Sequence, residues 1–207
     1  QISKGNGESC VLSAYSSSVI NLSNHFTTSL GITAQYFTLN KNWTVEPRAA
    51  LKWTFNPKHA LALAYGLHSR RERLDYYFVE QEVNGKTEPN RYLNFSKAHH
   101  FGLTYDWNIN SYMHLKVEPY YQYLFRIPVE ENSSFSIINH QSFYLERILK
   151  NRGSGVNYGI DITLEQYMKN GFYYMITASL FKSRYKAGDH IWRNTRLDKN
   201  YLLNVLA

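Results

Sequence analysis

Residues Asn157–Tyr185, NYGIDITLEQYMKNGFYYMITASLFKSRY, decide the fold because apolar and polar residues alternate on both sides of one turn signal, Lys169-Asn170-Gly171. Successive strand residues point to opposite faces of a sheet, so each arm has an apolar and a polar face. The apolar face of the first arm consists of Val156, Tyr158, Ile160, Ile162 and Leu164. Each arm can run for about ten residues, close to the roughly 9 to 11 that cross a bilayer when tilted. The stretch therefore predicts a hairpin of two long antiparallel strands.

The same alternation recurs along the chain and predicts an all-β fold. Thr44–Phe55 is the clearest further example, because Glu46, Arg48 and Lys52 alternate with apolar residues. Besides the two arms of the hairpin, the predicted strands are 10–22, 27–39, 44–55, 60–68, 98–107, 114–126 and 200–207. We expect about nine strands in an antiparallel up-and-down meander. The polar passage Arg70–Lys97 is expected to extend its flanking strands and to turn near Asn84-Gly85.

The connections between the predicted strands fall into two classes. The odd connections are tight turns at Ser23, Asn56, Asn108 and Lys169. The long connections are all even and follow Arg70, Arg126 and Arg184, whereas the second, at Asn40, is short. Odd and even connections of a meander lie at opposite ends of the sheet, so every long loop falls on one rim. Outer-membrane barrels show this asymmetry, with short periplasmic turns and long extracellular loops.

Composition is compatible with such a barrel. The 207 residues are 43% hydrophobic with a mean hydropathy of -0.47, and no window approaches 18 apolar residues, which excludes helical membrane spans. A barrel strand needs only alternate apolar residues. Aromatic residues make up 16% of the chain, and Trp53, Phe55 and Trp107 lie beside predicted short turns, where an interfacial aromatic girdle is expected.

Charge and cysteine content exclude other classes of protein. The net charge of +7 is dispersed, so that each long loop carries an excess of only about one, and no basic stripe suited to nucleic acid results. The single Cys10 rules out an internal disulfide framework. Gln1–Ser9 is polar and has no signal-peptide core, so we expect that a signal has been removed or that the chain begins partway through a longer protein.

Four stretches resemble the C-terminal barrel of TonB-dependent outer-membrane receptors, in particular the Bacteroidetes-type branch. They are EPRAALKWTFNPKHALALAYGLHSR (46–70), LNFSKAHHFGLTYDWNI (93–109), LKVEPYYQYLFRIPV (115–129) and the opening hairpin. The resemblance implies uptake of a scarce solute bound at the extracellular face, with the TonB complex acting on an N-terminal plug. Plug, TonB-contacting box and completed final strands are not found in residues 1–207, and nine strands cannot close a barrel of roughly 22. We therefore expect a segment of a large transmembrane β-barrel.

Candidate site residues fall into two groups. Ligand-contact candidates in the long loops are Arg70, Arg71, Tyr76, Tyr77, Trp192 and Arg193. The alternative is that these six side chains are solvated loop residues or pack one loop against another. The predicted lumen-facing residues are Glu46, Arg48, Lys52, Lys116, Glu118, Asp161 and Glu165. We expect Asp161 and Glu165 to be lumen-lining charges balanced by neighbours such as Arg48, Lys52 or Lys116.

Catalytic chemistry is not indicated. Asp161 and Glu165 share one strand face but lie roughly 13 Å apart, beyond the roughly 5 to 9.5 Å of glycosidase carboxylate pairs. His99 and His100 are adjacent and so point to opposite faces, which does not form a metal-ligand set. No nucleophile elbow, phosphate loop or dinucleotide fingerprint occurs. We predict a protein that is not an enzyme and that has no cofactor or metal.

The sequence thus predicts part of an active transporter in the outer membrane of a Gram-negative cell. Its expected partners are outer-membrane lipid, a transported small solute or oligomer, and the TonB complex through the missing N-terminal region, with no nucleic acid. The sequence does not identify the solute. Two alternatives stay open, namely a soluble all-β module that binds glycans through its aromatic residues, and a passive porin or barrel enzyme.

Overall fold

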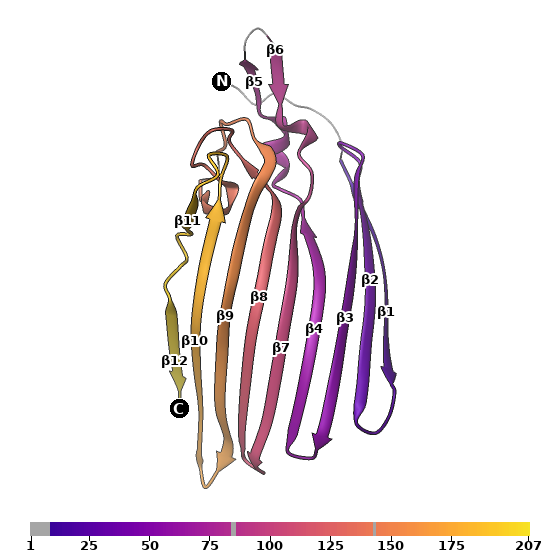
Figure 1. The fold of residues 1–207 in the computed structure, drawn as a ribbon, viewed down its shortest axis with the longest axis vertical. Coiled ribbons are helices and arrows are strands. Elements are labelled where there is room, and N and C mark those ends of the chain that lie inside the picture. The colour runs from indigo at the N-terminus through magenta and orange to yellow at the C-terminus, as the bar shows by residue number, and fades with distance from the viewer. Residues whose placement is uncertain (1–8, 84–85, 143) are drawn as a thin grey trace.

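The computed structural model describes residues 9–83, 86–142 and 144–207, and its main element is one antiparallel sheet of 10 strands (Figure 1). The long strands are β1 (Val11–Asn21), β2 (Phe26–Phe37), β3 (Asn42–Asn56), β4 (His59–Arg70), β7 (Ser96–Asn110), β8 (Met113–Val129), β9 (Lys150–Lys169) and β10 (Phe172–Lys186). They pair in chain order. The shorter β11 (Trp192–Asn194) and β12 (Tyr201–Leu206) both pair with β10. The predicted meander is confirmed. Among the described residues, no helix is long and apolar enough to span a membrane.

The hairpin that decides the fold joins β9 and β10 through Asn170 and Gly171. Both residues have positive φ, 53° and 80°, as a two-residue hairpin turn that matches the strand twist requires. The register places Thr163 opposite Thr177 and Ile162 opposite Ala178. β9 begins at Lys150, further toward the long loops than the alternation from Val156 indicated.

Short and long connections lie at opposite ends of the sheet, as predicted. The short turns join β1 to β2, β3 to β4, β7 to β8 and β9 to β10 at the lower end in Figure 1. The segments that follow β4, β8 and β10 gather at the upper end. We call this upper end the long-loop rim.

The expectation that Arg70–Lys97 extends its flanking strands was wrong. β4 and β7 end as a pair at Arg70 and Ser96. Between them the chain forms the 3₁₀ turn η1 (Leu74–Phe78), the separate hairpin of β5 (Glu80–Val83) and β6 (Lys86–Pro89), and the 3₁₀ turn η2 (Asn90–Tyr92). The predicted turn at Asn84-Gly85 lies outside the described residues. The segment leaves the sheet because its apolar side chains are buried against the rim.

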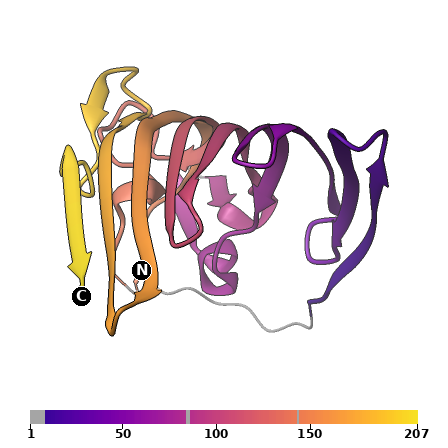
Figure 2. The same ribbon diagram turned by 90° about the horizontal axis from the view of Figure 1, so that it is seen from below.

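A hydrophobic cluster holds the long-loop rim together on the concave side of the sheet. Its buried members are Phe37, Tyr76, Tyr77, Val79, Leu93, Phe95, Leu145 and Leu149. They come from the end of β2, from the β4–β7 connection and from the β8–β9 connection, so three segments distant in sequence share one core. η1 and η2 lie within the arc of the sheet when it is seen along the strands (Figure 2).

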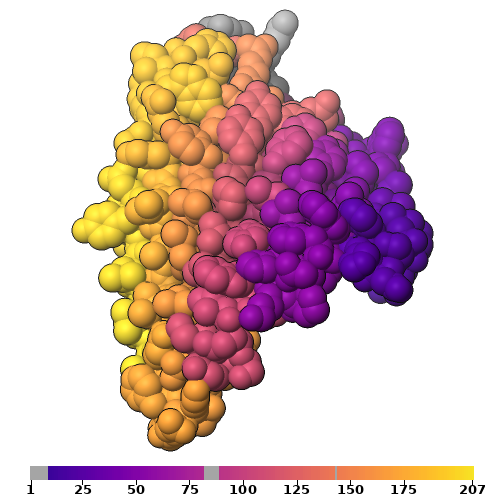
Figure 3. All heavy atoms as spheres, turned by 60° about the horizontal axis from the view of Figure 1, so that its bottom comes forward, coloured from indigo at the N-terminus to yellow at the C-terminus, as the bar shows by residue number. Residues whose placement is uncertain are grey.

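The opposite, convex face of the sheet is apolar and exposed. Leu51, Leu63 and Leu103 are successive register partners on β3, β4 and β7, and their exposed fractions are 43, 60 and 36%. Nearer the long-loop rim, Phe101 lies opposite Tyr121 in β8 and is likewise exposed. Figure 3 shows this face as a continuous surface from which the β9–β10 hairpin projects at the short-turn end.

Stacked aromatic rings mark the short-turn end, as the sequence predicted for Trp53, Phe55 and Trp107. Phe26 stacks on Trp53 with 5.9 Å between ring centroids, and Trp53 contacts Phe55 at 5.0 Å. His59 continues the row, at 5.7 Å from both Phe55 and Trp107. The row crosses four neighbouring strands at one height, which is the arrangement of an interfacial girdle.

Truncating Leu93 tests the rim cluster. We expect Leu93→Ala to lower the stability of the rim against urea by about 2 to 5 kcal/mol, because Leu93 is 4% exposed and its loss leaves a cavity. Limited proteolysis of the long loops at increasing urea measures the effect. The matched control is Leu197→Ala, since Leu197 is 68% exposed and its truncation should change stability by less than about 0.5 kcal/mol. Equal effects would show that the cluster does not hold the rim.

Candidate functional site

A pocket between the concave face of the sheet and η3 (Ile137–Asn139) shows which strand residues lie on that face. His100 of β7 and Leu124 of β8 line this pocket together with Ile137 and Ile138. His100 pairs with Gly66, which pairs with Arg48, so Arg48 lies on the same face. Glu46 and Lys52 share that face by alternation.

The lumen-facing candidates of the later strands lie on this face too. Gln122 of β8 pairs with His100, so Lys116 and Glu118 share its side of the sheet by alternation. Asp161 lies opposite Glu118, and Glu165 lies opposite His114. All seven predicted lumen-facing residues therefore occupy one face, opposite the apolar convex face.

Glu46 is the centre of a hydrogen-bond network that joins three strands. Its carboxylate is 2% exposed and accepts hydrogen bonds from Gln35 Nε2 of β2 at 2.8 Å and from the hydroxyl of Ser69 in β4. Arg48 NH2 lies 3.3 Å from its second oxygen. A buried carboxylate is stable only when its oxygens are paired in this way. Glu46 therefore has a structural role in the wall.

Two of the basic residues expected to balance Asp161 and Glu165 pair with other carboxylates. Arg48 pairs with Glu46 of its own strand, and Lys116 Nζ lies 2.8 Å from Glu118 of its own strand. Residues two apart on a strand share a face, so these pairs form within one strand. Arg48 and Lys116 thus have nearer acidic partners, and the charge balance of Asp161 and Glu165 stays a prediction.

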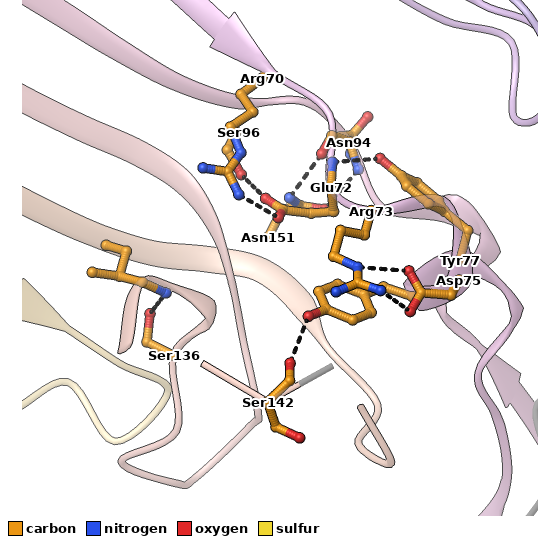
Figure 4. Close-up of polar contacts among 12 residues, drawn as sticks. Arg70, Glu72, Arg73, Asp75, Tyr77, Asn94, Ser96, Ser136, Ser142 and Asn151 are labelled. Atoms are coloured by element: carbon orange, nitrogen blue, oxygen red, sulfur yellow. Dashed lines mark hydrogen bonds and ion pairs between the residues drawn. The ribbon is translucent and has the colours of Figure 1, made fainter. Parts of the chain in front are cut away.

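The ligand-contact candidates before β5 differ in accessibility. Tyr76 and Tyr77 are 5 and 1% exposed and belong to the rim cluster, so they pack inside the rim and do not present a free ring. Burial raises the pKa of the Tyr77 hydroxyl to about 12, and this hydroxyl accepts a hydrogen bond from the Glu72 backbone N–H at 3.2 Å. Arg71 lies over the Phe37 ring at 5.9 Å. Arg70 extends toward Glu72 (Figure 4).

The candidates on β11 lie at another part of the rim. The Trp192 ring is 39% exposed and faces Arg184 and Lys186 of β10, at 5.8 and 5.7 Å from its centroid. The Arg193 guanidinium donates to both carboxylate oxygens of Asp189, at 2.9 and 2.6 Å. These hydrogen bonds from Arg193 lower the pKa of the Asp189 carboxyl. Arg193 is thus engaged by its own loop, whereas Trp192 presents part of its ring.

A pocket of about 380 Å³ beneath the rim was missed by the sequence analysis. Its polar lining includes His68, Glu72, Ser96 and His100. The RRER run at Arg70–Arg73 and the adjacent His99 and His100 were visible in the sequence. Only the pairing of β4 with β7 brings Arg70, Glu72 and His100 to one pocket. His99 points away, as predicted, and its Nδ1 lies 3.0 Å from the Tyr65 hydroxyl. In the described part of the chain, no group of three or more His, Cys, Asp or Glu residues could hold a metal ion.

Removing the Glu46 carboxylate tests the polar wall. We expect Glu46→Ala to lower the free energy of unfolding by about 3 to 5 kcal/mol, because Gln35, Ser69 and Arg48 lose their shared acceptor. Urea unfolding in detergent, followed by tryptophan fluorescence, measures the loss. Glu165→Ala is the control on the same face and should cost less than about 1 kcal/mol. Equal losses would contradict a structural role for Glu46.

Acid should open the Asp189–Arg193 loop. A carboxyl whose pKa is lowered by folding stabilises the fold above its unfolded pKa of about 4, and this contribution is lost as the pH falls through the lowered folded value. We therefore expect acrylamide quenching of Trp192 to rise below about pH 4, in a protein whose other Trp residues are replaced by Phe. Arg193→Gln should show strong quenching already at neutral pH. Quenching of Arg193→Gln that matches the parent protein at every pH would contradict the role of this ion pair.

No family model and no curated protein matches this sequence, but solved structures share its fold. The ferric-catecholate import receptor Fiu from K12 E. coli (closed form) matches with a TM-score of 0.70 at 9% identity, covering 95% of this chain and 31% of that chain. The FrpB iron transporter from Neisseria meningitidis (F3-3 variant) matches with a TM-score of 0.64 at 13% identity, covering 88% of this chain and 27% of that chain. The F5-1 variant of the same transporter, in apoprotein form, matches with a TM-score of 0.62 at 12% identity, covering 87% of this chain and 27% of that chain.

The chain spans less than a third of the length of each of these structures. At such low identities the likeness concerns the fold. The chain has the fold of a segment of the β-barrel of TonB-dependent receptors.

Proposed function

We propose that this chain forms part of the wall of an outer-membrane active transporter, which binds a scarce solute at its extracellular loops and imports it with TonB coupling. The observation that carries the proposal is the division of one long-stranded sheet into an apolar convex face and a polar concave face. Apolar surface in contact with lipid carries no hydrophobic penalty, whereas the same surface exposed to water costs about 25 cal/mol of free energy per Å². A polar inner face suits a solute path.

The long-loop rim supports the extracellular assignment of the solute site. All long connections gather there, together with the partly exposed ring of Trp192 and the exposed side chain of Arg70. The short turns and the aromatic row lie at the other end, where the periplasmic interface is expected. Selectivity would therefore reside in the rim and the upper part of the concave face.

The two alternatives are less well supported. A soluble glycan-binding module would have to keep Leu51, Leu63 and their neighbours in water over a continuous surface, which monomeric soluble proteins rarely do. A passive porin shares the two-faced wall, but the solved structures that match are an import receptor and iron transporters. Import by these proteins favours uptake over passive flow for this chain, without transferring iron as the solute. The Bacteroidetes-type branch, the plug and TonB coupling are predictions.

Site-directed labelling tests the orientation of the wall. In a Cys10→Ser background, we expect Tyr144→Cys to react with a membrane-impermeant maleimide on intact cells, because Tyr144 is 82% exposed on the long-loop rim. Lys58→Cys in the β3–β4 turn should react only after the outer membrane is permeabilised. Labelling of both positions on intact cells, or recovery of the protein in the soluble fraction, would refute the transmembrane assignment.

Bilayer conductance separates active from passive transport. We expect the complete gene product to show no steady open-channel conductance in planar bilayers, because a plugged barrel blocks ion flow, and to retain the purified periplasmic domain of TonB on an affinity column. A stable conductance of porin size without TonB retention would establish the passive alternative.

A further inference from the structure

The pocket beneath the long-loop rim has the features of a built binding site. Three strands form its floor, and η3 with the following residue His140 closes it on the concave side. Its volume of about 380 Å³ falls in the range of pockets for small ligands. None of its lining residues is a buried member of the rim cluster, although Ile137 packs against that cluster.

The Glu72 carboxylate is the unusual group in this pocket. The residue is 3% exposed, and its Oε1 accepts a hydrogen bond from the Ser96 hydroxyl at 2.7 Å (Figure 4). Its Oε2 is buried and has no hydrogen-bond partner within the described ranges. An ionised oxygen that has lost water without gaining a donor is costly, so the site favours a ligand that supplies a cationic donor.

Positive charge lies beside this carboxylate. Arg70 NH2 is 3.8 Å from Glu72 Oε2, which is an ion-pair distance beyond hydrogen-bond reach. The side chain of Arg70 is 78% exposed, so its guanidinium can bind a second acceptor. Lys97 also lines the pocket. An anion at Arg70 would therefore sit next to a cation at Glu72.

The remaining wall is apolar. Leu124 and Ile127 of β8 line the pocket together with Ile137 and Ile138 of the η3 segment. Aliphatic side chains at this position favour a ligand with an apolar part of similar size.

We propose that this pocket binds a small zwitterion, namely an α-amino acid with an aliphatic side chain. The ammonium of the ligand donates to Glu72 Oε2, its carboxylate accepts from the Arg70 guanidinium, and its side chain packs against the isoleucines of η3. The proposal deepens the proposed function and rests on it for the assignment of the concave face to the lumen. A purely anionic ligand would meet the Glu72 carboxylate, and a purely cationic one would meet Arg70 and Lys97.

A ligand series on the unmodified protein tests the charge requirement. Leucine, isocaproate, which lacks the amine, and isoamylamine, which lacks the carboxylate, are titrated calorimetrically into the complete gene product in detergent. We expect leucine to bind at least about tenfold more tightly than either analogue, because each analogue leaves one charged group of the pocket without a partner. No leucine binding, or equal binding of leucine and isocaproate, would overturn the proposal.

Two variants assign the charges to residues. Glu72→Gln should weaken leucine binding by at least about tenfold and should strengthen rather than weaken isocaproate binding, because it removes a like charge beside the carboxylate, whereas Arg70→Gln should weaken leucine and isocaproate but not isoamylamine. The matched controls are Glu131→Gln and Arg152→Gln, which disrupt an ion pair of 2.7 Å outside the pocket and should bind leucine normally. If Glu72→Gln does not fold, Arg70→Gln and the ligand series still decide the outcome.

Binding in detergent does not depend on uptake, so the two proposals fail separately. Normal cell-surface labelling and TonB retention without leucine binding would overturn only the amino-acid site. Failure of the labelling pattern would overturn the transporter.

Discussion

The pairing of backbone hydrogen-bond groups between long strands is the constraint on which the rest of this structure depends. A strand placed in hydrocarbon cannot pair its N–H and C=O groups with water, so each must be met by a neighbouring strand. The register of β9 with β8 and β10 satisfies this over nearly the whole length of β9. Once that register is set, a one-residue shift would turn every apolar side chain of the outer face inward.

The polar concave face makes its own demands on the side chains. Several charges there are paired over short distances along or between strands, as Glu46 is with Gln35, Ser69 and Arg48. Glu72 differs from Glu46, because one of its oxygens is buried without a hydrogen-bond donor. Glu46 is therefore part of the wall, whereas Glu72 belongs to the pocket for which we propose a ligand.

The rim combines a hydrophobic cluster with the pocket proposed to bind a ligand. Its hydrophobic cluster draws on β2 and on two long connections, so the loops are held against the sheet and leave a defined pocket beneath η3. Tyr76 and Tyr77 look like recognition residues in sequence, but they form part of this support. Arg70 and Trp192, at the edges of the cluster, retain exposed surface.

The sequence by itself determined the strands, their order, the placement of the turns and the two faces, because period-two alternation and turn residues act locally. Asn170-Gly171 predicted the hairpin turn, and Glu46 to Thr54 predicted the two faces of β3. Only the tertiary structure decided the course of Arg70–Lys97, the burial of Tyr76 and Tyr77, and the hydrogen bond from Ser96 to Glu72. These depend on contacts between residues more than twenty positions apart, which no local pattern encodes.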